Sequence, residues 1–224
     1  MTGPFPPQGS SSPRRRGSSR HAGAPFRWSR LIDRKPLLWA LLSLPAAQIA
    51  YHWFAEDLWP DELVAPAGEW SARFLIVALM LTPLAMLLPR SRLVGWLIRR
   101  RRAFGVAGFG YAALHLFFYA LEMETLANVW DEVELPGIWT GWLALLLMVP
   151  LALTSNDASM RALRVGWKRL QRLAYPVALL TLIHWILVHN GLAEALVWFA
   201  PLALLQSWRV VRHLRRRRQP LQAV

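Results

Sequence analysis

The stretch that decides the fold reads RRRRAFGVAGFGYAALHLFFYALE and runs from Arg99 to Glu122. Four arginines precede an apolar run, 103–121, that is long enough for a helix to cross a hydrocarbon core of about 30 Å at about 1.5 Å per residue. One histidine, His115, interrupts this run. An ionisable side chain is costly in lipid unless it is satisfied, so the stretch predicts a transmembrane helix that carries a functional group.

Similar apolar runs recur along the chain, which is 55% hydrophobic, against about 45–50% for soluble domains. They predict an all-α bundle of six transmembrane helices within residues 35–212. The six helices are expected at 36–54, 70–89, 103–121, 137–154, 173–190 and 194–211. Residues 1–34 are rich in Pro, Gly, Ser and Arg, which is typical of a disordered arm, and residues 213–224 form a basic tail.

Basic and acidic residues alternate between the segments that connect the predicted helices. Of the 26 Lys and Arg, 25 fall in the arm through Lys35, in 90–102, in 161–172 and in the tail from Arg209, whereas 11 of the 13 Asp and Glu fall in the intervening loops. The positive-inside rule then places both termini in the cytoplasm. In this arrangement the net charge of +13 favours contact with anionic lipid over nucleic acid.

Two of the six histidines stand out as candidate metal ligands. The chain contains no cysteine, so a metal must be held by His, Met or carboxylate. His115 and His184 lie inside apolar runs, 13 residues after Arg102 and 12 residues after Arg172, which places both rings at similar depth in the outer half of the membrane. The other four lie in the arm, in the tail or at outer helix ends: His21, His213, His52 and His189.

Two imidazoles at one depth on parallel helices can bind one iron. Haem iron needs only axial ligands from the protein, whereas bare zinc or copper would need further donors that the apolar layer lacks. We therefore predict one haem b between His115 and His184. Gly108, on the same helical face as His115, leaves room for a flat ring, and close helix packing is its other interpretation. Alternatively, each imidazole only hydrogen-bonds a backbone carbonyl or Thr181.

Arg73 is the one basic residue outside the four basic segments, one turn into the second predicted helix from its outer end. Such a side chain either reaches the headgroup region or pairs with a buried anion. We expect the anion to be a haem propionate, because the predicted haem lies near the same end of the bundle.

Several motifs follow one another in a fixed order from the second predicted helix to the last. They are Gly68, Leu81-Thr82-Pro83-Leu84, 99–105, 113–119, Leu153-Thr154-Ser155-Asn156, Trp167-Lys168-Arg169-Leu170 and 175–185. This order resembles the ferric-reductase-like transmembrane family, and within it the haem subunits of bacterial methionine sulfoxide repair. The resemblance implies an inner-membrane electron-transfer subunit with haem and FMN as cofactors. It also implies a quinone-pool or cytoplasmic flavin-reductase donor and a periplasmic molybdopterin-containing reductase as acceptor.

Gln171 departs from the family pattern. The family commonly has a further histidine at this position, 13 residues before the later ligand, and about 20 Å of helix between them leaves space for a second haem. Here the third predicted helix offers only Arg101 or Arg102 at that level. We therefore expect one haem, with electron entry from a flavin or quinone at the inner side.

A non-redox membrane scaffold or small transporter is the alternative function. Transport sites commonly use broken helices, whereas Pro45, Pro83 and Pro150 stand alone in their apolar runs. This comparison favours an electron-transfer subunit. The colour of the purified protein distinguishes the two functions, since only a haem protein absorbs visible light.

Overall fold

The computed structural model describes residue 3, residues 35–189 and residues 191–218. These residues form helices and connecting loops without a strand, which confirms the all-α class. The predicted arm, with His21, lies outside the described residues apart from Gly3, and so does the end of the tail.

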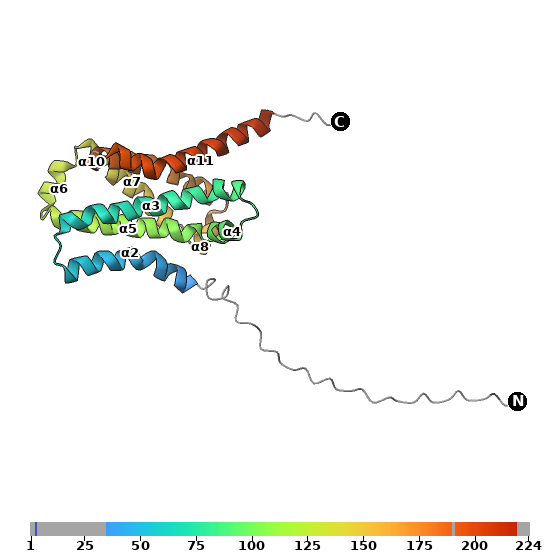
Figure 1. Cartoon of the computed structure of the whole chain (residues 1–224), viewed down its shortest axis with the longest axis horizontal. Coiled ribbons are helices and arrows are strands. Elements are labelled where there is room, and N and C mark those ends of the chain that lie inside the picture. The colour runs from blue at the N-terminus through green and yellow to red at the C-terminus, as the bar shows by residue number, and fades with distance from the viewer. Residues whose placement is uncertain (1–2, 4–34, 190, 219–224) are drawn as a thin grey trace.

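A long helix lies over each of the six predicted segments (Figure 1). The six are α2 (Lys35–Ala55), α3 (Pro60–Leu87), α5 (Arg101–Glu122), α7 (Pro136–Leu153), α10 (Ala174–His189) and α11 (Leu192–Arg218). Shorter helices connect them: α4 (Arg92–Arg99), α6 (Leu126–Glu132), α8 (Asp157–Leu163), α9 (Val165–Leu170) and the 3-10 helix η1 (Gln171–Leu173).

Four segments of the described chain are long and apolar enough to cross a membrane. They are Pro60–Leu87, Arg101–Glu122, Pro136–Leu153 and Val165–Val188, the last of which joins α9, η1 and α10. The helices α2 and α11 do not meet this criterion, so six crossings and a cytoplasmic location of both termini stay predictions. The structure supports a membrane helical bundle, in which α2 begins and α11 ends at the same end (Figure 1).

The second predicted helix begins ten residues earlier than expected, at Pro60 rather than at residue 70. Its first turn is polar but has strong helix-start signals, with proline at the first position and two acidic residues, Asp61 and Glu62, beside the positive end of the helix dipole. The Glu62 carboxylate accepts a hydrogen bond of 3.0 Å from the Trp59 backbone N–H. Apolar run length does not detect such a polar turn.

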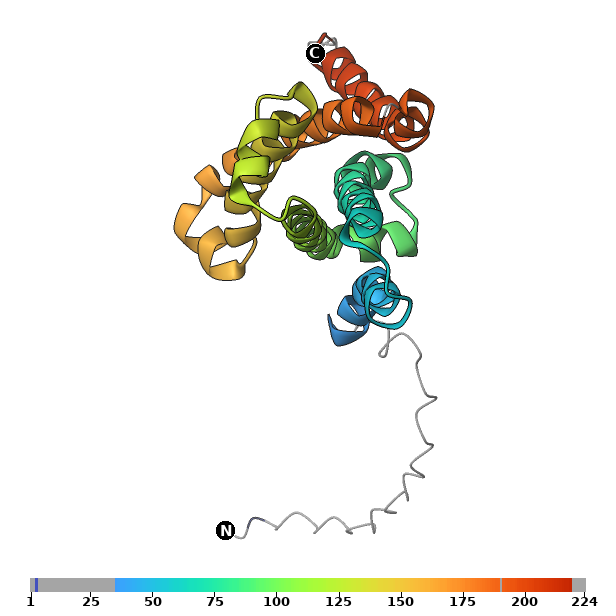
Figure 2. The ribbon, with the colours of Figure 1, turned by 90° about the vertical axis from the view of Figure 1, so that its left-hand side faces the viewer.

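Two helix pairs, α3 with α5 and α7 with α10, make the closest contacts in the bundle. Helix α2 packs against α3 and α5, and α11 packs against α3 (Figure 2). One apolar cluster lies among α2, α3 and α5, and the other among α3, α7, α10 and α11. The second cluster therefore connects the two helix pairs.

The two ends of the bundle differ in charge. We call the end where α5 and α10 begin the basic end, because residues 90–102 and 161–172 lie there. We call the opposite end, where α3 and α7 begin, the acidic end. The acidic end includes α6 and carries Asp61, Glu122 and Glu132.

Candidate functional site

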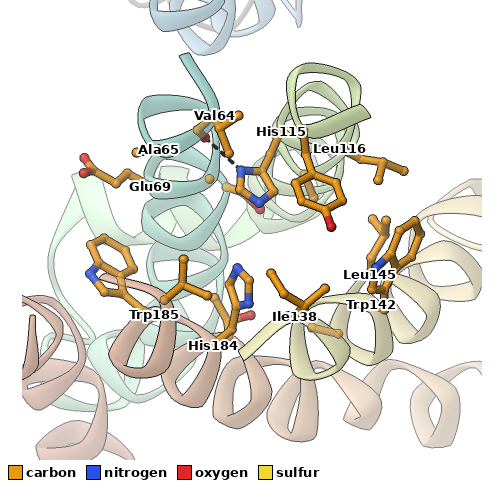
Figure 3. A pocket seen from close by; sticks show the side chains of 18 of the residues that line it. Val64, Ala65, Glu69, His115, Leu116, Ile138, Trp142, Leu145, His184 and Trp185 are labelled. Carbon is orange, nitrogen blue, oxygen red and sulfur yellow. Dashed lines mark hydrogen bonds between the residues drawn. The ribbon is translucent and has the colours of Figure 1, made fainter. Parts of the chain in front are cut away.

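His115 on α5 and His184 on α10 face each other between the two helix pairs (Figure 3). The centroids of the two rings are 6.0 Å apart and the ring planes are inclined by 86°. Both residues lie in the last two turns of their helices, toward the acidic end. The structure thus brings together the two histidines that the sequence places at similar depth.

Each imidazole is held by a backbone carbonyl of the helix paired with its own. Nδ1 of His115 lies 2.8 Å from the carbonyl oxygen of Val64 on α3 (Figure 3). Nδ1 of His184 lies 2.7 Å from the carbonyl oxygen of Gly137 on α7. A carbonyl oxygen only accepts hydrogen bonds, so Nδ1 donates in both rings, and the lone pair of a neutral ring is then on Nε2.

A glycine lies against each ring, one helical turn after the carbonyl that holds it. A Cβ atom at Gly68 would lie 2.9 Å from Nδ1 of His115, and one at Gly141 would lie 2.7 Å from both Nδ1 and Cε1 of His184. These distances are far inside van der Waals contact. The rings occupy the space that a side chain at these two positions would fill, so only glycine fits there. Neither glycine was identified from the sequence as part of the site.

The two rings border a cavity of about 480 Å³, which is within the usual range for ligand sites of about 300–1,000 Å³. Apolar side chains form much of its wall, including Trp142, Met148 and Trp185. Toward the acidic end its lining is polar: Asp61, Glu69, Tyr119, Glu122 and Glu132. Asp61 and Glu122 are exposed, so the cavity reaches the surface at that end.

Tyr119 connects this polar lining to the loop helix α6, because its hydroxyl donates a 3.2 Å hydrogen bond to the Glu132 carboxylate. Thr181 also lines the cavity, but its hydroxyl donates to the carbonyl of Val177 on its own helix, at 2.9 Å. The carbonyl contacts proposed from the sequence as the alternative role of the histidines are present. They are made through Nδ1 of each ring.

Arg73 pairs with a carboxylate of the protein itself. Its Nη2 donates to Glu69, which lines the cavity, and its guanidinium lies over the rings of Trp70 and Trp198, at 4.9 and 4.7 Å. Its side chain is 20% exposed, and its buried Nε has no hydrogen-bond partner among the described residues. Glu69 is therefore an anion that the sequence analysis did not foresee.

Gly108 lies in the contact between α5 and α3, where a Cβ atom would be 3.3 Å from the backbone oxygen of Ser71 and 3.5 Å from the nitrogen of Leu75. It is not among the residues that line the cavity. Its surroundings support the interpretation of close helix packing.

His52 and His213 lie away from the cavity. His52 is hydrogen-bonded at the surface, with Nδ1 2.6 Å from the Glu56 carboxylate, and His213 is exposed in α11. Within the described segments, no group of three or more His, Cys, Asp or Glu could hold a metal ion. His115 and His184 thus offer two nitrogen donors to a metal, and the described residues add no third His, Cys, Asp or Glu to them.

A smaller cavity of about 140 Å³ lies toward the basic end and is lined by Arg101, Arg102 and Gln171. Met148 lines both cavities. The Gln171 amide donates to the carbonyl of Leu151, at 3.3 Å, near the C-terminal end of α7, where helix carbonyls have no partner in the helix.

Comparison with known proteins identifies the family. Residues 67–182 match the ferric reductase like transmembrane component family. A protein of Xanthomonas campestris pv. campestris, named protein-methionine-sulfoxide reductase heme-binding subunit MsrQ, is 39% identical over 161 residues, which are 70% of this chain and 72% of the relative. A protein of the same name from Azospira oryzae is 34% identical over 81% of this chain and 80% of the relative. One from Caulobacter vibrioides is 35% identical over 78% of this chain and 85% of the relative.

No solved structure matches the chain. The family match covers most of α3, all of α5 and α7 and the first part of α10; it includes His115 and ends two residues before His184. This agrees with the resemblance found in the sequence. The chain therefore belongs to the ferric-reductase-like transmembrane family, among the relatives named MsrQ.

Proposed function

We propose that the chain is a membrane electron-transfer subunit that holds one haem b between His115 and His184. One observation carries the proposal: two imidazoles face each other across a cavity, each with Nδ1 anchored on a carbonyl. This anchoring is the usual arrangement around histidines that bind a metal, because it fixes the tautomer and increases the basicity of the other nitrogen. The names of the relatives, which describe heme-binding subunits, support the same cofactor.

The spacing of the two rings fits a metal between them. The measured separation of the centroids is 6.0 Å. Two protein donors suffice for an iron that already has four porphyrin nitrogens, and the described residues offer no third donor for a bare ion.

Bound haem would supply an iron that gains and loses one electron, and the residues of the chain set its surroundings. His115 and His184 fix the position of the cofactor, and the apolar wall with Trp142 and Trp185 excludes water. Glu69 places a carboxylate at the cavity, and Arg73 offsets that charge. The direct contact between Arg73 and a propionate stays a prediction, which the unpartnered Nε supports.

The acidic end is the side on which we expect the electron acceptor to bind. The cavity with the two histidines reaches the surface there, between Asp61 and Glu122. In the predicted topology this end faces the periplasm, and the relatives are named as subunits of a methionine sulfoxide reductase. The acceptor is then a periplasmic molybdopterin-containing reductase, and electrons enter from quinol or a flavin at the basic end.

The test is a visible spectrum of the detergent-purified protein, oxidised and dithionite-reduced, with a pyridine haemochrome assay. We expect a low-spin spectrum and one haem b per chain. Reduced protein should then be reoxidised by methionine sulfoxide only when the molybdopterin-containing reductase is present. A protein without a Soret band would refute the haem proposal and favour the scaffold or transporter.

A further inference from the structure

We propose that Gly68 and Gly141 are positioning residues for the two histidines, each forming a socket with a carbonyl one helical turn earlier. This inference rests on the proposed haem site. The α3 socket consists of the Val64 carbonyl and Gly68, and the α7 socket of the Gly137 carbonyl and Gly141. Each socket determines how close a ring lies to the neighbouring helix and in which direction Nε2 points.

The α3 socket receives His115 from α5. The three atoms nearest to an added Cβ at Gly68 all belong to this ring, at 2.9, 3.1 and 3.5 Å. The carbonyl of Val64 holds Nδ1 of the same ring at 2.8 Å. Because carbonyl and glycine lie four residues apart, they face the ring from consecutive turns of one helix face.

The α7 socket repeats this arrangement with unrelated neighbouring sequence. The atoms nearest to an added Cβ at Gly141 all belong to the ring of His184, two of them at 2.7 Å. The carbonyl of Gly137, again four residues earlier, holds Nδ1 at 2.7 Å. Two independent helix pairs therefore use the same device at the same level of the bundle.

A methyl group in either socket would push the ring away from the helix and break the bond from Nδ1 to the carbonyl. Without that bond the tautomer is no longer fixed, and the ligand nitrogen becomes less basic. Changes to such outer partners commonly lower metal affinity about 10- to 100-fold. A less basic ligand also stabilises the oxidised iron less, so the midpoint potential should rise.

The first test compares Gly68→Ala and Gly141→Ala with Gly110→Ala in the full-length, haem-loaded protein. Gly110 lies on α5, is exposed, and has nothing within 4 Å of an added Cβ. We expect both socket variants to lose low-spin haem and to show a more positive midpoint potential, whereas Gly110→Ala keeps the wild-type spectrum and potential. If the socket variants matched Gly110→Ala while the wild type bound haem, the inference would be wrong and the proposed function would stand.

A second test does not depend on haem and covers variants that fold poorly. Since a Cβ at Gly68 would meet only the His115 ring at short distance, Gly68→Ala should lower the Tm in the wild-type background and not in a His115→Ala background. The same holds for Gly141→Ala with and without His184→Ala. If the alanine lowered the Tm equally in both backgrounds, the glycine would act on something other than the ring, and the socket would be refuted.

Discussion

Two cavities of the described bundle share Met148 in their linings and differ in size and in the side chains that line them. The one toward the acidic end has about 480 Å³ and two anchored imidazoles. The one toward the basic end has about 140 Å³, with Gln171 on η1 and Arg101 and Arg102 on α5. The cavity toward the acidic end has two facing imidazoles in its lining, and the lining of the other has no histidine.

Under the proposed function, this difference implies that a haem level in a helical bundle needs more than one suitable residue. At the level of His115 and His184, each imidazole has its own carbonyl and its own glycine. At the level of Gln171, the amide side chain contributes hydrogen bonds to the end of α7 instead. Variants at the two levels should therefore differ sharply in their effect on haem content.

The largest effect is expected from removing a ligand. His115→Ala or His184→Ala should abolish low-spin absorbance, and haem affinity should fall by more than the about 10- to 100-fold typical of outer-shell changes. Pyridine haemochrome assays and oxidised and reduced spectra measure this. His52→Ala is the control, since His52 lies at the surface. If the His184→Ala protein kept the wild-type spectrum, His184 would not bind haem, and the two levels would not differ in the way proposed.

An intermediate effect is expected from the ion pair beside the larger cavity. Arg73→Leu leaves the Glu69 carboxylate uncompensated, which stabilises the oxidised iron and lowers the midpoint potential. Redox titration of Arg73→Leu, alone and combined with Glu69→Gln, separates two explanations of the change in midpoint potential. If Arg73 acts through Glu69, adding Glu69→Gln restores the potential, and if Arg73 contacts a propionate, it does not. An unchanged potential in Arg73→Leu would exclude both.

The smallest effect is expected at the smaller cavity. Gln171→Ala should keep one haem per chain and lower the free energy of unfolding by about 1 kcal/mol or less, because its hydrogen bonds are long. Gln171→His should also leave the haem count at one, since α5 offers arginines rather than a second imidazole. A count of two in Gln171→His would show that the fold retains a second haem level.

Much of the fold could be predicted from the sequence, because apolar run length and bracketing charges are local signals. Helices lie over all six predicted segments, and α3 differs most, since its polar first turn at Pro60 carries no hydropathy signal. The similar depth of His115 and His184 followed from nearly equal offsets to the basic residues, because helical rise converts sequence distance into depth. The match to the family is confirmed.

The details of the site depend on how helices rotate against one another, which the sequence does not show. Gly108 lies on the same face as His115 within α5, but that part of the face packs on α3 rather than on the cavity. Gly68 and Gly141 lie on other helices, so only the assembled bundle brings them to the rings. For the same reason Glu69 was not foreseen as the partner of Arg73.

The anchoring of both rings at Nδ1 also bears on the speed of electron transfer. An electron moves quickly when the surrounding nuclei shift little as the charge changes, that is, when the reorganisation energy is small. Rings fixed by a carbonyl on one side and by a glycine surface beneath have little freedom to tilt or rotate. The rigid backbones of α3 and α7 would therefore hold the same ligand geometry in both oxidation states.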